Sequence, residues 1–143
     1  MASTAATAKT AQPLDPSFPK GRFHIAKANA ADWRVGLRPH FAYRDLGIDA
    51  ATAGKVLAQV IRARQACDGP GDEHTHALDF QMVYVLKGWM RTEFEGVGER
   101  TLEAGDCMYQ EPGIRHRVLD YADDLEVLEI TIPAEFETDT VAP

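Results

Sequence analysis

The stretch that decides the fold is residues 71–88, which read GDEHTHALDFQMVYVLKG. Its second half, residues 80–86, is a short apolar run that ends at a Lys87-Gly88 turn signal, and this pattern predicts a β-strand. Apolar residues stand at both parities of that run, which is typical of a strand covered on both faces. Its first half carries His74 and His76 two residues apart. In an extended chain this spacing places both imidazoles on one face of a sheet.

Short strand-like runs separated by turn signals extend in both directions from this stretch. Residues 50–65 contain helix formers, but the β-branched Val56, Val60 and Ile61 favour a strand there. A GVG turn at residues 96–98 predicts a hairpin. No long stripe of helical period is present, so the pattern predicts an all-β sandwich or barrel. The strand-like runs are residues 41–48, 55–64, 80–86, 89–95, 100–102, 107–110, 114–121 and 125–132.

The first 20 residues differ in composition from the rest. Residues 1–20 are small, polar and proline-rich, with little apolar material to bury, so we expect a flexible N-terminal arm. From Phe23 and Ile25 onward, apolar side chains recur at mostly odd spacing, which predicts that strands begin there. We therefore expect a single folded domain over residues 21–143.

Composition and charge narrow the classes of partner. The chain has 143 residues, and its 15 Lys and Arg stand against 22 Asp and Glu, for a net charge of -7. This balance argues against nucleic acid or an anionic membrane as the main partner, because both require a basic surface. The two cysteines form no disulfide framework, and no apolar run approaches the roughly 18 residues of a membrane span. We expect a cytoplasmic protein.

A third histidine strengthens the case for a metal site. His116 lies in residues 111–120, EPGIRHRVLD, in a strand entered through a Pro112-Gly113 turn. A His-x-His pair by itself also fits two surface histidines. Three of the five histidines, however, fall at the ends of strands of one predicted barrel, and neutral imidazoles are common ligands of transition metals.

At this point the sequence resembles the cupin superfamily, on two motifs in the family's order. The family's first motif, G-x5-H-x-H-x3or4-E-x6-G, corresponds here to Gly69 or Gly71, His74, His76, Gln81 and Gly88. Its second motif, G-x5-P-x-G-x2-H-x3-N, corresponds to Gly105, Pro112, Gly113, His116 and Asp120. The spacings of the glycines and of Pro112 differ slightly, as surface loops allow. The resemblance covers residues 69–120 and implies a double-stranded β-helix, or jelly-roll, barrel.

The resemblance also implies a mononuclear metal site held by His74, His76, His116 and residue 81. The family's glutamate ligand is replaced here by Gln81, so this set of ligands is neutral. Gln81 either binds the metal through its amide oxygen or points inward and hydrogen-bonds a ligand histidine or water. A divalent ion, with iron, nickel or manganese favoured and zinc or copper as alternatives, would keep its full charge. Such a site favours an anionic, chelating oxygen ligand.

Two further positions are candidates for the interior of the barrel. Glu129 shares strand parity with Leu125 and Val127, so it is a candidate general base on the cavity side, where burial would raise its pKa. Alternatively, it faces water or pairs with an arginine. Cys107 and Tyr109 share one parity of a short strand, and one or both are candidates to approach the cavity.

These features lead to a hypothesis about function. The resemblance implies a metal-dependent dioxygenase that acts on a small chelating oxygen substrate such as a diketone, its enolate or a catechol-like molecule. The alternatives are a metal-dependent isomerase or lyase, and a binding module without catalysis. Small single-barrel cupins usually dimerise, so the resemblance also implies a homodimer.

Overall fold

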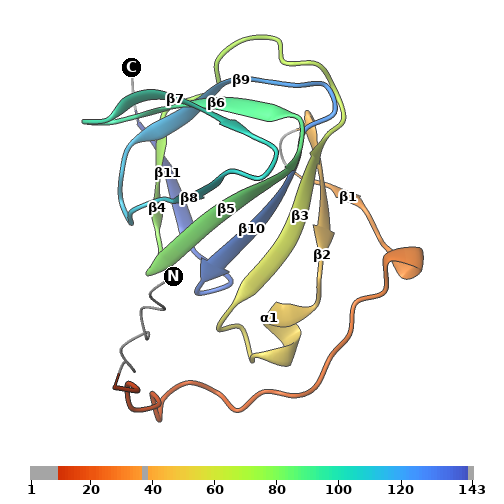
Figure 1. Cartoon of the computed structure of the whole chain (residues 1–143), viewed down its shortest axis with the longest axis vertical. Helices are drawn as coiled ribbons and strands as arrows, with labels where there is room; N and C mark the ends of the chain where they lie inside the picture. The colour runs from red at the N-terminus through yellow and green to blue at the C-terminus, as the bar shows by residue number, and fades with distance from the viewer. Residues whose placement is uncertain (1–9, 37–38, 142–143) are drawn as a thin grey trace, which may run out of the picture.

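The fold consists of two antiparallel β-sheets that face each other (Figure 1). The computed structural model describes residues 10–36 and 39–141. Sheet A contains, in spatial order, β1 (Arg34–Val35), β2 (Phe41–Asp45), β3 (Leu57–Ala63), β10 (Glu126–Ile132), β5 (Phe80–Lys87) and β8 (Cys107–Tyr109). Sheet B contains β11 (Glu137–Thr140), β4 (His74–Ala77), β9 (His116–Tyr121), β6 (Trp89–Phe94) and β7 (Gly98–Glu103). This arrangement confirms the predicted all-β, jelly-roll barrel.

Helical structure is confined to short turns in the described ranges. A 3-10 turn, η1, covers Ala28–Ala30, and α1 covers Ile48–Ala51. Neither helix, nor any other in residues 10–36 and 39–141, has the length and apolar character needed to cross a membrane. The helix formers at the start of residues 50–65 thus contribute only the end of α1. Residues 57–63 form β3, which pairs with β2 on one side and β10 on the other, as the β-branched residues indicated.

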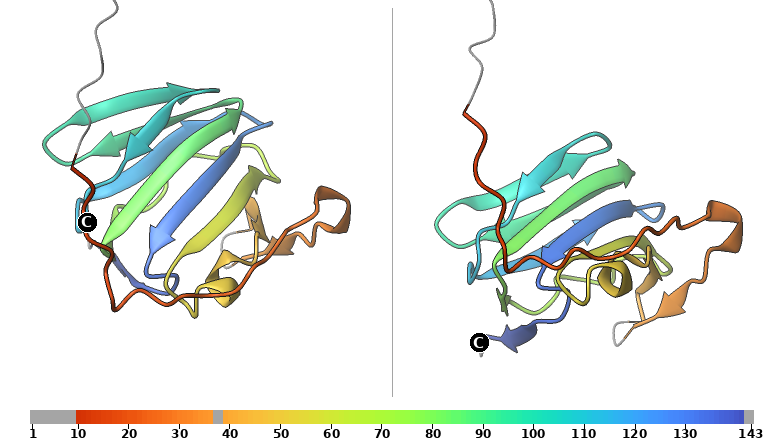
Figure 2. Two further views of the ribbon diagram at one scale, coloured as in Figure 1. Left: turned by 60° about the horizontal axis from the view of Figure 1, so that its bottom comes forward. Right: turned by 90° about the horizontal axis from the view of Figure 1, so that it is seen from below.

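The prediction that strands begin near Phe23 was wrong. Residues 21–33 contain η1 and no strand, and the side chains of Phe23 and Ile25 are 89% and 62% exposed. Figure 2 shows residues 10–33 running along the outside of the sheets toward β1. A strand needs a hydrogen-bonded neighbour strand, and the ladder of sheet A ends at its edge strand β1, which pairs with β2. Residues 1–9 of the expected arm lie outside the described residues.

The hydrophobic core lies between the inner faces of the two sheets. On β5, Val83 and Val85 are buried, while Tyr84 and Leu86 on the opposite parity are exposed. On β10, Val127 points inward in the same way. This alternation follows from the two-residue period of a strand. The core cluster consists of Val83, Val85, Met90, Leu102, Tyr121, Leu125 and Val127.

Two buried threonines allow a matched test of polar burial. Thr92 and Thr131 are 1% and 0% exposed. The Thr131 hydroxyl donates to the Pro133 carbonyl at 3.0 Å, whereas Thr92 Oγ1 is a buried side-chain oxygen without a hydrogen-bond partner among the described residues. Because valine has nearly the same shape, Thr92→Val should stabilise the metal-free protein by about 1 kcal/mol, and Thr131→Val should destabilise it by about as much. Urea unfolding checks both signs. Equal destabilisation by both variants would contradict this account of Thr92.

Candidate functional site

Three histidines from two neighbouring strands form one cluster. His74 and His76 lie on the same face of β4, and His74 pairs directly with His116 of β9. The ring centroids are 4.2 Å apart for His74 and His116, 4.8 Å for His74 and His76, and 4.9 Å for His76 and His116. One ring nitrogen from each residue lies within 4.8 Å of the other two. The structure therefore brings all three predicted histidines together.

Hydrogen bonds at Nδ1 determine which ring nitrogen each histidine can offer. Nδ1 of His74 lies 2.8 Å from the Asp72 carbonyl, and Nδ1 of His116 lies 2.9 Å from the Ile114 carbonyl. A carbonyl oxygen only accepts, so in the neutral form of both rings Nδ1 carries the proton and Nε2 carries the lone pair. His76 Nδ1 lies 2.8 Å from the Thr138 hydroxyl of β11. Such partners hold the rings of metal-ligating histidines in place, so this donor set fits a divalent transition metal ion.

A chain of side-chain hydrogen bonds leads from a carboxylate to this cluster. Gln59 of β3 and Gln81 of β5 each donate an amide N–H to Glu129 of β10, at 2.8 and 3.1 Å. The amide oxygen of Gln81 accepts a bond of 2.9 Å from Nε2 of Gln110, the residue that follows β8. The same Nε2 lies 3.2 Å from Nε2 of His116. We call these five residues the polar relay.

Glu129 lines the interior of the barrel. Its carboxylate is buried, the residue as a whole is half-buried, and it is one of the residues that line the cavity. Burial raises the pKa of Glu129 above its ordinary value, while the hydrogen bonds from Gln59 and Gln81 oppose that shift. The balance leaves a carboxyl group that holds its proton more tightly than an exposed glutamate does.

Gln81 lies between Glu129 and the histidine cluster. It is 4% exposed, and both polar atoms of its amide are hydrogen-bonded, the nitrogen to Glu129 and the oxygen to Gln110. The oxygen that would bind a metal ion is thus engaged with another side chain. This arrangement favours the second interpretation of Gln81, an inward hydrogen-bonding amide.

Sequence reasoning missed Gln110. The expectation that Cys107 or Tyr109 approaches the cavity was wrong, because both are exposed, and Met108 and Gln110 line the cavity instead. The parity of β8 is set by its pairing with β5, where Met108 stands opposite the buried Val83. A signal was available in the sequence. Gln110 lies two residues before the Pro112-Gly113 turn and two residues after Met108, so it shares the strand parity of an apolar side chain.

The cluster and the polar relay, apart from Gln59, line one cavity of about 550 Å³ between the sheets. Its polar residues are His74, His76, His116, Gln81, Gln110, Glu129, Thr92, Thr138 and Tyr43. Its apolar walls are formed by Phe41, Ile61, Val83, Met90, Met108, Val118, Leu125, Val127 and Phe136. A cavity with apolar walls and convergent polar groups is typical of sites for small organic molecules.

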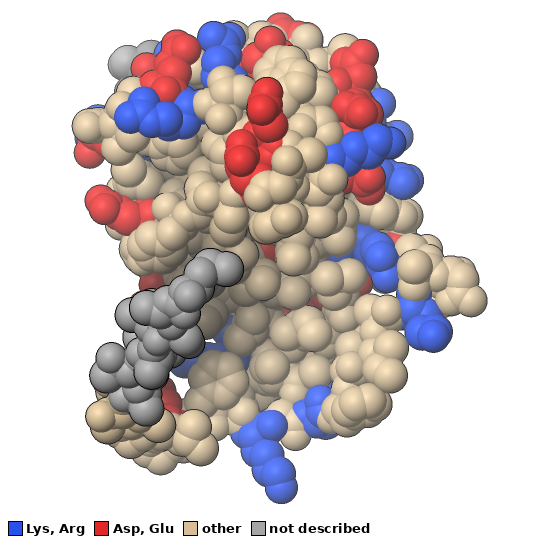
Figure 3. Space-filling model, viewed as in Figure 1, with Lys and Arg blue, Asp and Glu red and all other residues tan. Residues whose placement is uncertain are grey.

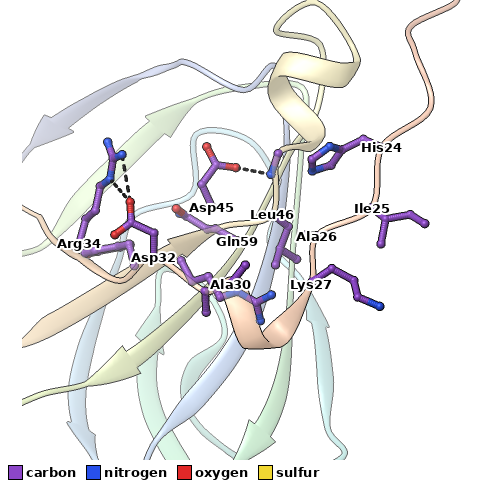
Figure 4. Close-up of a pocket in the computed structure, with 14 residues that line it drawn as sticks. His24, Ile25, Ala26, Lys27, Ala30, Asp32, Arg34, Asp45, Leu46 and Gln59 are labelled. Atoms are coloured by element: carbon purple, nitrogen blue, oxygen red, sulfur yellow. Dashed lines mark hydrogen bonds and ion pairs between the residues drawn. The ribbon is translucent and has the colours of Figure 1, made fainter.

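A second hollow of about 610 Å³ lies between the N-terminal segment and β2, and Figure 4 shows the residues around it. Tyr43 lines both this hollow and the barrel cavity. Gln59 also lines this hollow, and it is the residue of the polar relay that donates to Glu129. Asp45 accepts a hydrogen bond from the Gly47 backbone at 2.7 Å, and His24 packs so closely over Gly47 that a Cβ has no room there. The second hollow therefore shares a wall with the barrel cavity at the Glu129 end of the relay.

Comparisons with known proteins agree with this architecture. Residues 65–131 match the cupin domain family. No curated protein sequence matches the chain at a significant level. KdgF from Halomonas sp. is similar in structure, with a TM-score of 0.60, 20% identity, and coverage of 78% of this chain and 96% of that one.

Two other structures broaden the comparison. The polyketide cyclase RemF from Streptomyces resistomycificus has a TM-score of 0.67 at 15% identity, over 85% of this chain and 87% of that one. HEPD from Streptomyces albus, solved with 2-hydroxyethylphosphonate and Fe(II) bound, has a TM-score of 0.56 at 20% identity, over 73% of this chain and 24% of that one. Together with the two facing sheets and the histidine cluster, the family match assigns residues 65–131 of the chain to the cupin superfamily.

Proposed function

We propose that this protein is a mononuclear metal-dependent dioxygenase that acts on a small chelating oxygen substrate, such as a 1,3-diketone, its enolate or a catechol-like molecule. One observation carries the proposal. A buried carboxylate, Glu129, and a cluster of three histidines line the same cavity and are connected through Gln81 and Gln110. A metal-binding cluster and a base in one cavity are what enolate chemistry requires.

In this proposal His74, His76 and His116 hold the metal ion through their Nε2 atoms. Iron, nickel or manganese are the favoured ions, and zinc or copper also accept imidazole. When bound, the ion would act as a Lewis acid that polarises substrate oxygens. The three histidines bring no negative charge, so the site favours an anionic oxygen ligand. The structural neighbour HEPD, solved with Fe(II), supports iron as the first ion to test.

Glu129 acts as the base in this proposal. Its carboxylate accepts the proton that leaves the substrate as the enolate forms. The raised pKa of Glu129 lies closer to neutral pH than that of an exposed glutamate, and a carboxylate with a higher pKa is a stronger base. Gln59 and Gln81 hold the two carboxylate oxygens in place during the transfer. The apolar walls around it, including Val83 and Val127, exclude water from the reacting atoms.

An oxygen electrode tests the proposal. Protein reconstituted with Fe(II), Ni(II) or Mn(II) is mixed with 2,4-pentanedione or with a panel of catechols. The expected result is oxygen uptake that needs both the metal and the substrate. Substrate turnover at an unchanged rate under strict anaerobiosis would exclude a dioxygenase.

A metal-dependent isomerase or lyase is the second candidate, because Glu129 by itself suffices for proton abstraction. NMR in deuterated water under anaerobic conditions identifies this chemistry, since substrate carbon-bound hydrogens would exchange and product would form without O2. If the metal-loaded protein binds chelating ligands but turns none of them over, the non-catalytic binding module takes first place.

We further propose a homodimer formed through the outer face of sheet A. Tyr84 and Leu86 are 37% and 47% exposed, and Tyr84 lies beside Leu128 in the sheet. At the start of β10, Glu126 stands in register with Arg62 of β3 and Lys87 of β5, so the face carries charges of both signs beside its apolar residues. An identical face can therefore meet it across a two-fold axis. The outer face of sheet B, by contrast, is charged. Its strands β6, β7 and β9 and the adjoining loops carry the ion pairs Arg91–Glu99, Arg115–Glu95 and Arg117–Glu93. Figure 3 shows charges of both signs at the top of the molecule, where these strands lie.

Light scattering after gel filtration checks the homodimer. The wild-type chain should elute at twice the mass of one chain. Tyr84→Arg should give a monomer, because it places a charge in the apolar face, and Thr101→Arg on β7 should remain a dimer. A monomeric wild-type protein would refute the proposed interface.

The two cysteines indicate the redox state of the cellular compartment. Cys67 and Cys107 are both free thiols in the structure. Unpaired cysteines are the norm in a reducing environment. We therefore propose a cytoplasmic location, which fractionation of the source cells tests.

A further inference from the structure

The direction of the hydrogen bonds in the polar relay is set by its carboxylate. Both oxygens of Glu129 accept, so Gln59 and Gln81 must each turn an amide nitrogen toward it. The amide oxygen of Gln81 then points the other way and needs a donor. Gln110 supplies that donor through Nε2 at 2.9 Å. The amide of Gln110 is therefore oriented by Glu129, two side chains away.

This orientation decides which atom of Gln110 faces the histidine cluster. The Nε2 that donates to Gln81 also lies 3.2 Å from Nε2 of His116. An amide nitrogen has two hydrogens, so one bonds Gln81 and the second points toward the lone pair of His116. The amide oxygen, the atom that binds metal ions, faces away from the cluster. Gln110 thus presents a hydrogen-bond donor at the edge of the metal site.

Burial makes that donor effective. Gln110 is 5% exposed and lines the barrel cavity, where water competes little for its hydrogens. When the lone pair of His116 is used to hold a metal ion, the second hydrogen of Gln110 loses its acceptor. A buried donor left without a partner is unfavourable, so an acceptor brought into the cavity beside His116 would be bound there.

We infer that Gln110 is a specificity-determining residue that donates a hydrogen bond to the anionic oxygen of the substrate beside His116. The inference rests on the proposed function and refines it, because it selects ligands by charge. An enolate, a catecholate or a carboxylate gains a charge-assisted hydrogen bond from the amide. A neutral nitrogen ligand has no lone pair left for this donor once it binds a metal ion, so it gains nothing.

The test compares an anionic and a neutral ligand on the same protein. Co(II) is loaded into the wild type, Gln110→Met, Gln110→Glu and the control Tyr109→Phe, whose side chain is exposed at the neighbouring position. Competition with a coloured chelator measures Co(II) affinity. Changes in the visible spectrum of Co(II) then give the dissociation constants of 2,4-pentanedione, which binds as its enolate, and of imidazole.

The expected result separates the two ligands. Gln110→Met, which keeps the length of the side chain and removes its donor, should weaken 2,4-pentanedione binding roughly 10- to 100-fold, the range of a hydrogen bond to a charged group. Co(II) and imidazole affinities should stay within about threefold of wild type. Gln110→Glu should weaken the diketone at least as much, because an acceptor replaces the donor. Tyr109→Phe should match wild type in all three measurements.

Each of the following results would overturn the inference. A loss of Co(II) affinity in Gln110→Met with unchanged diketone binding would make Gln110 a metal ligand, and equal loss of both organic ligands would make it a packing residue. If thermal melting shows that Gln110→Met does not fold, Gln110→Asn replaces it as the second variant. Unchanged diketone binding in both Gln110→Asn and Gln110→Glu would then contradict the inference. Failure of the proposed function is distinguishable: wild-type protein would then bind Co(II) and the diketone without turnover. Wild-type protein that takes up no Co(II) refutes both.

Discussion

Replacing His74 and His76 together by alanine should remove the metal from the protein. Wild-type protein purified without a histidine tag should contain roughly one divalent ion per chain after reconstitution, and the double variant less than about a tenth of that. The reason is that His116 would remain as a lone imidazole, and one neutral ligand does not hold a divalent ion against dilution. Elemental analysis by mass spectrometry measures the content, and metal-dependent turnover should fall to background with it.

A histidine outside the cluster provides the matched control. Nε2 of His40 lies 3.0 Å from the Asp68 carboxylate, and His40 is not part of the cluster. His40→Ala should therefore keep the wild-type metal content. Acidification is a second check, because imidazole must be deprotonated to bind. Metal should be released as the pH falls below about 6.5, the ordinary range of histidine. Full metal content in the double variant, or in wild type at about pH 4, would exclude the three-histidine site.

Glu129→Gln should lower the turnover rate by about 10²- to 10⁴-fold, the usual contribution of a general base. The substitution preserves the shape of the side chain and removes its ability to accept the substrate proton. Metal content should not change, since Glu129 is not among the clustered ligands. Steady-state kinetics with the substrate found in the oxygen-electrode screen gives the rate. A rate within threefold of wild type, at equal metal content, would show that the proton goes elsewhere.

The same variant should reveal the pKa of Glu129 through stability. Because burial raises the pKa of Glu129, the folded metal-free protein binds this proton more tightly than the unfolded chain does. Below the ordinary glutamate pKa both states are protonated, and no stability is lost. As the pH rises through the raised value, the folded state must bury a charge and loses stability relative to the unfolded chain.

Glu129→Gln has no such charge. Its free energy of unfolding relative to wild type should therefore increase from about pH 4 upward and level off once Glu129 is ionised in the folded state. Urea unfolding of both metal-free proteins across this range measures the difference. A difference that stays flat with pH, or that decreases, would contradict a raised pKa.

The strands and the histidine pair could be predicted from sequence because their signals are local. Residues 80–86 and 89–102 carry the alternation and turn residues that specify β5 and the β6–β7 hairpin. The two-residue spacing of His74 and His76 places both imidazoles on one face of any strand. The approach of His116 was predicted from the resemblance to the two cupin motifs, and the direct pairing of His74 with His116 agrees with it.

What the tertiary structure decided depends on register between distant strands. Gln59 and Glu129 meet because β3 pairs with β10, and Gln81 meets Gln110 because β5 pairs with β8. A shift of one residue in either pairing would turn these side chains to the opposite face. The sequence alone therefore determined the sheet class, the turns and the three histidines. Only the tertiary structure decided the polar relay, the hydrogen-bonding position of Gln81 and the course of residues 21–33. These features depend on which strands pair with each other, and packing across the whole barrel selects those pairs.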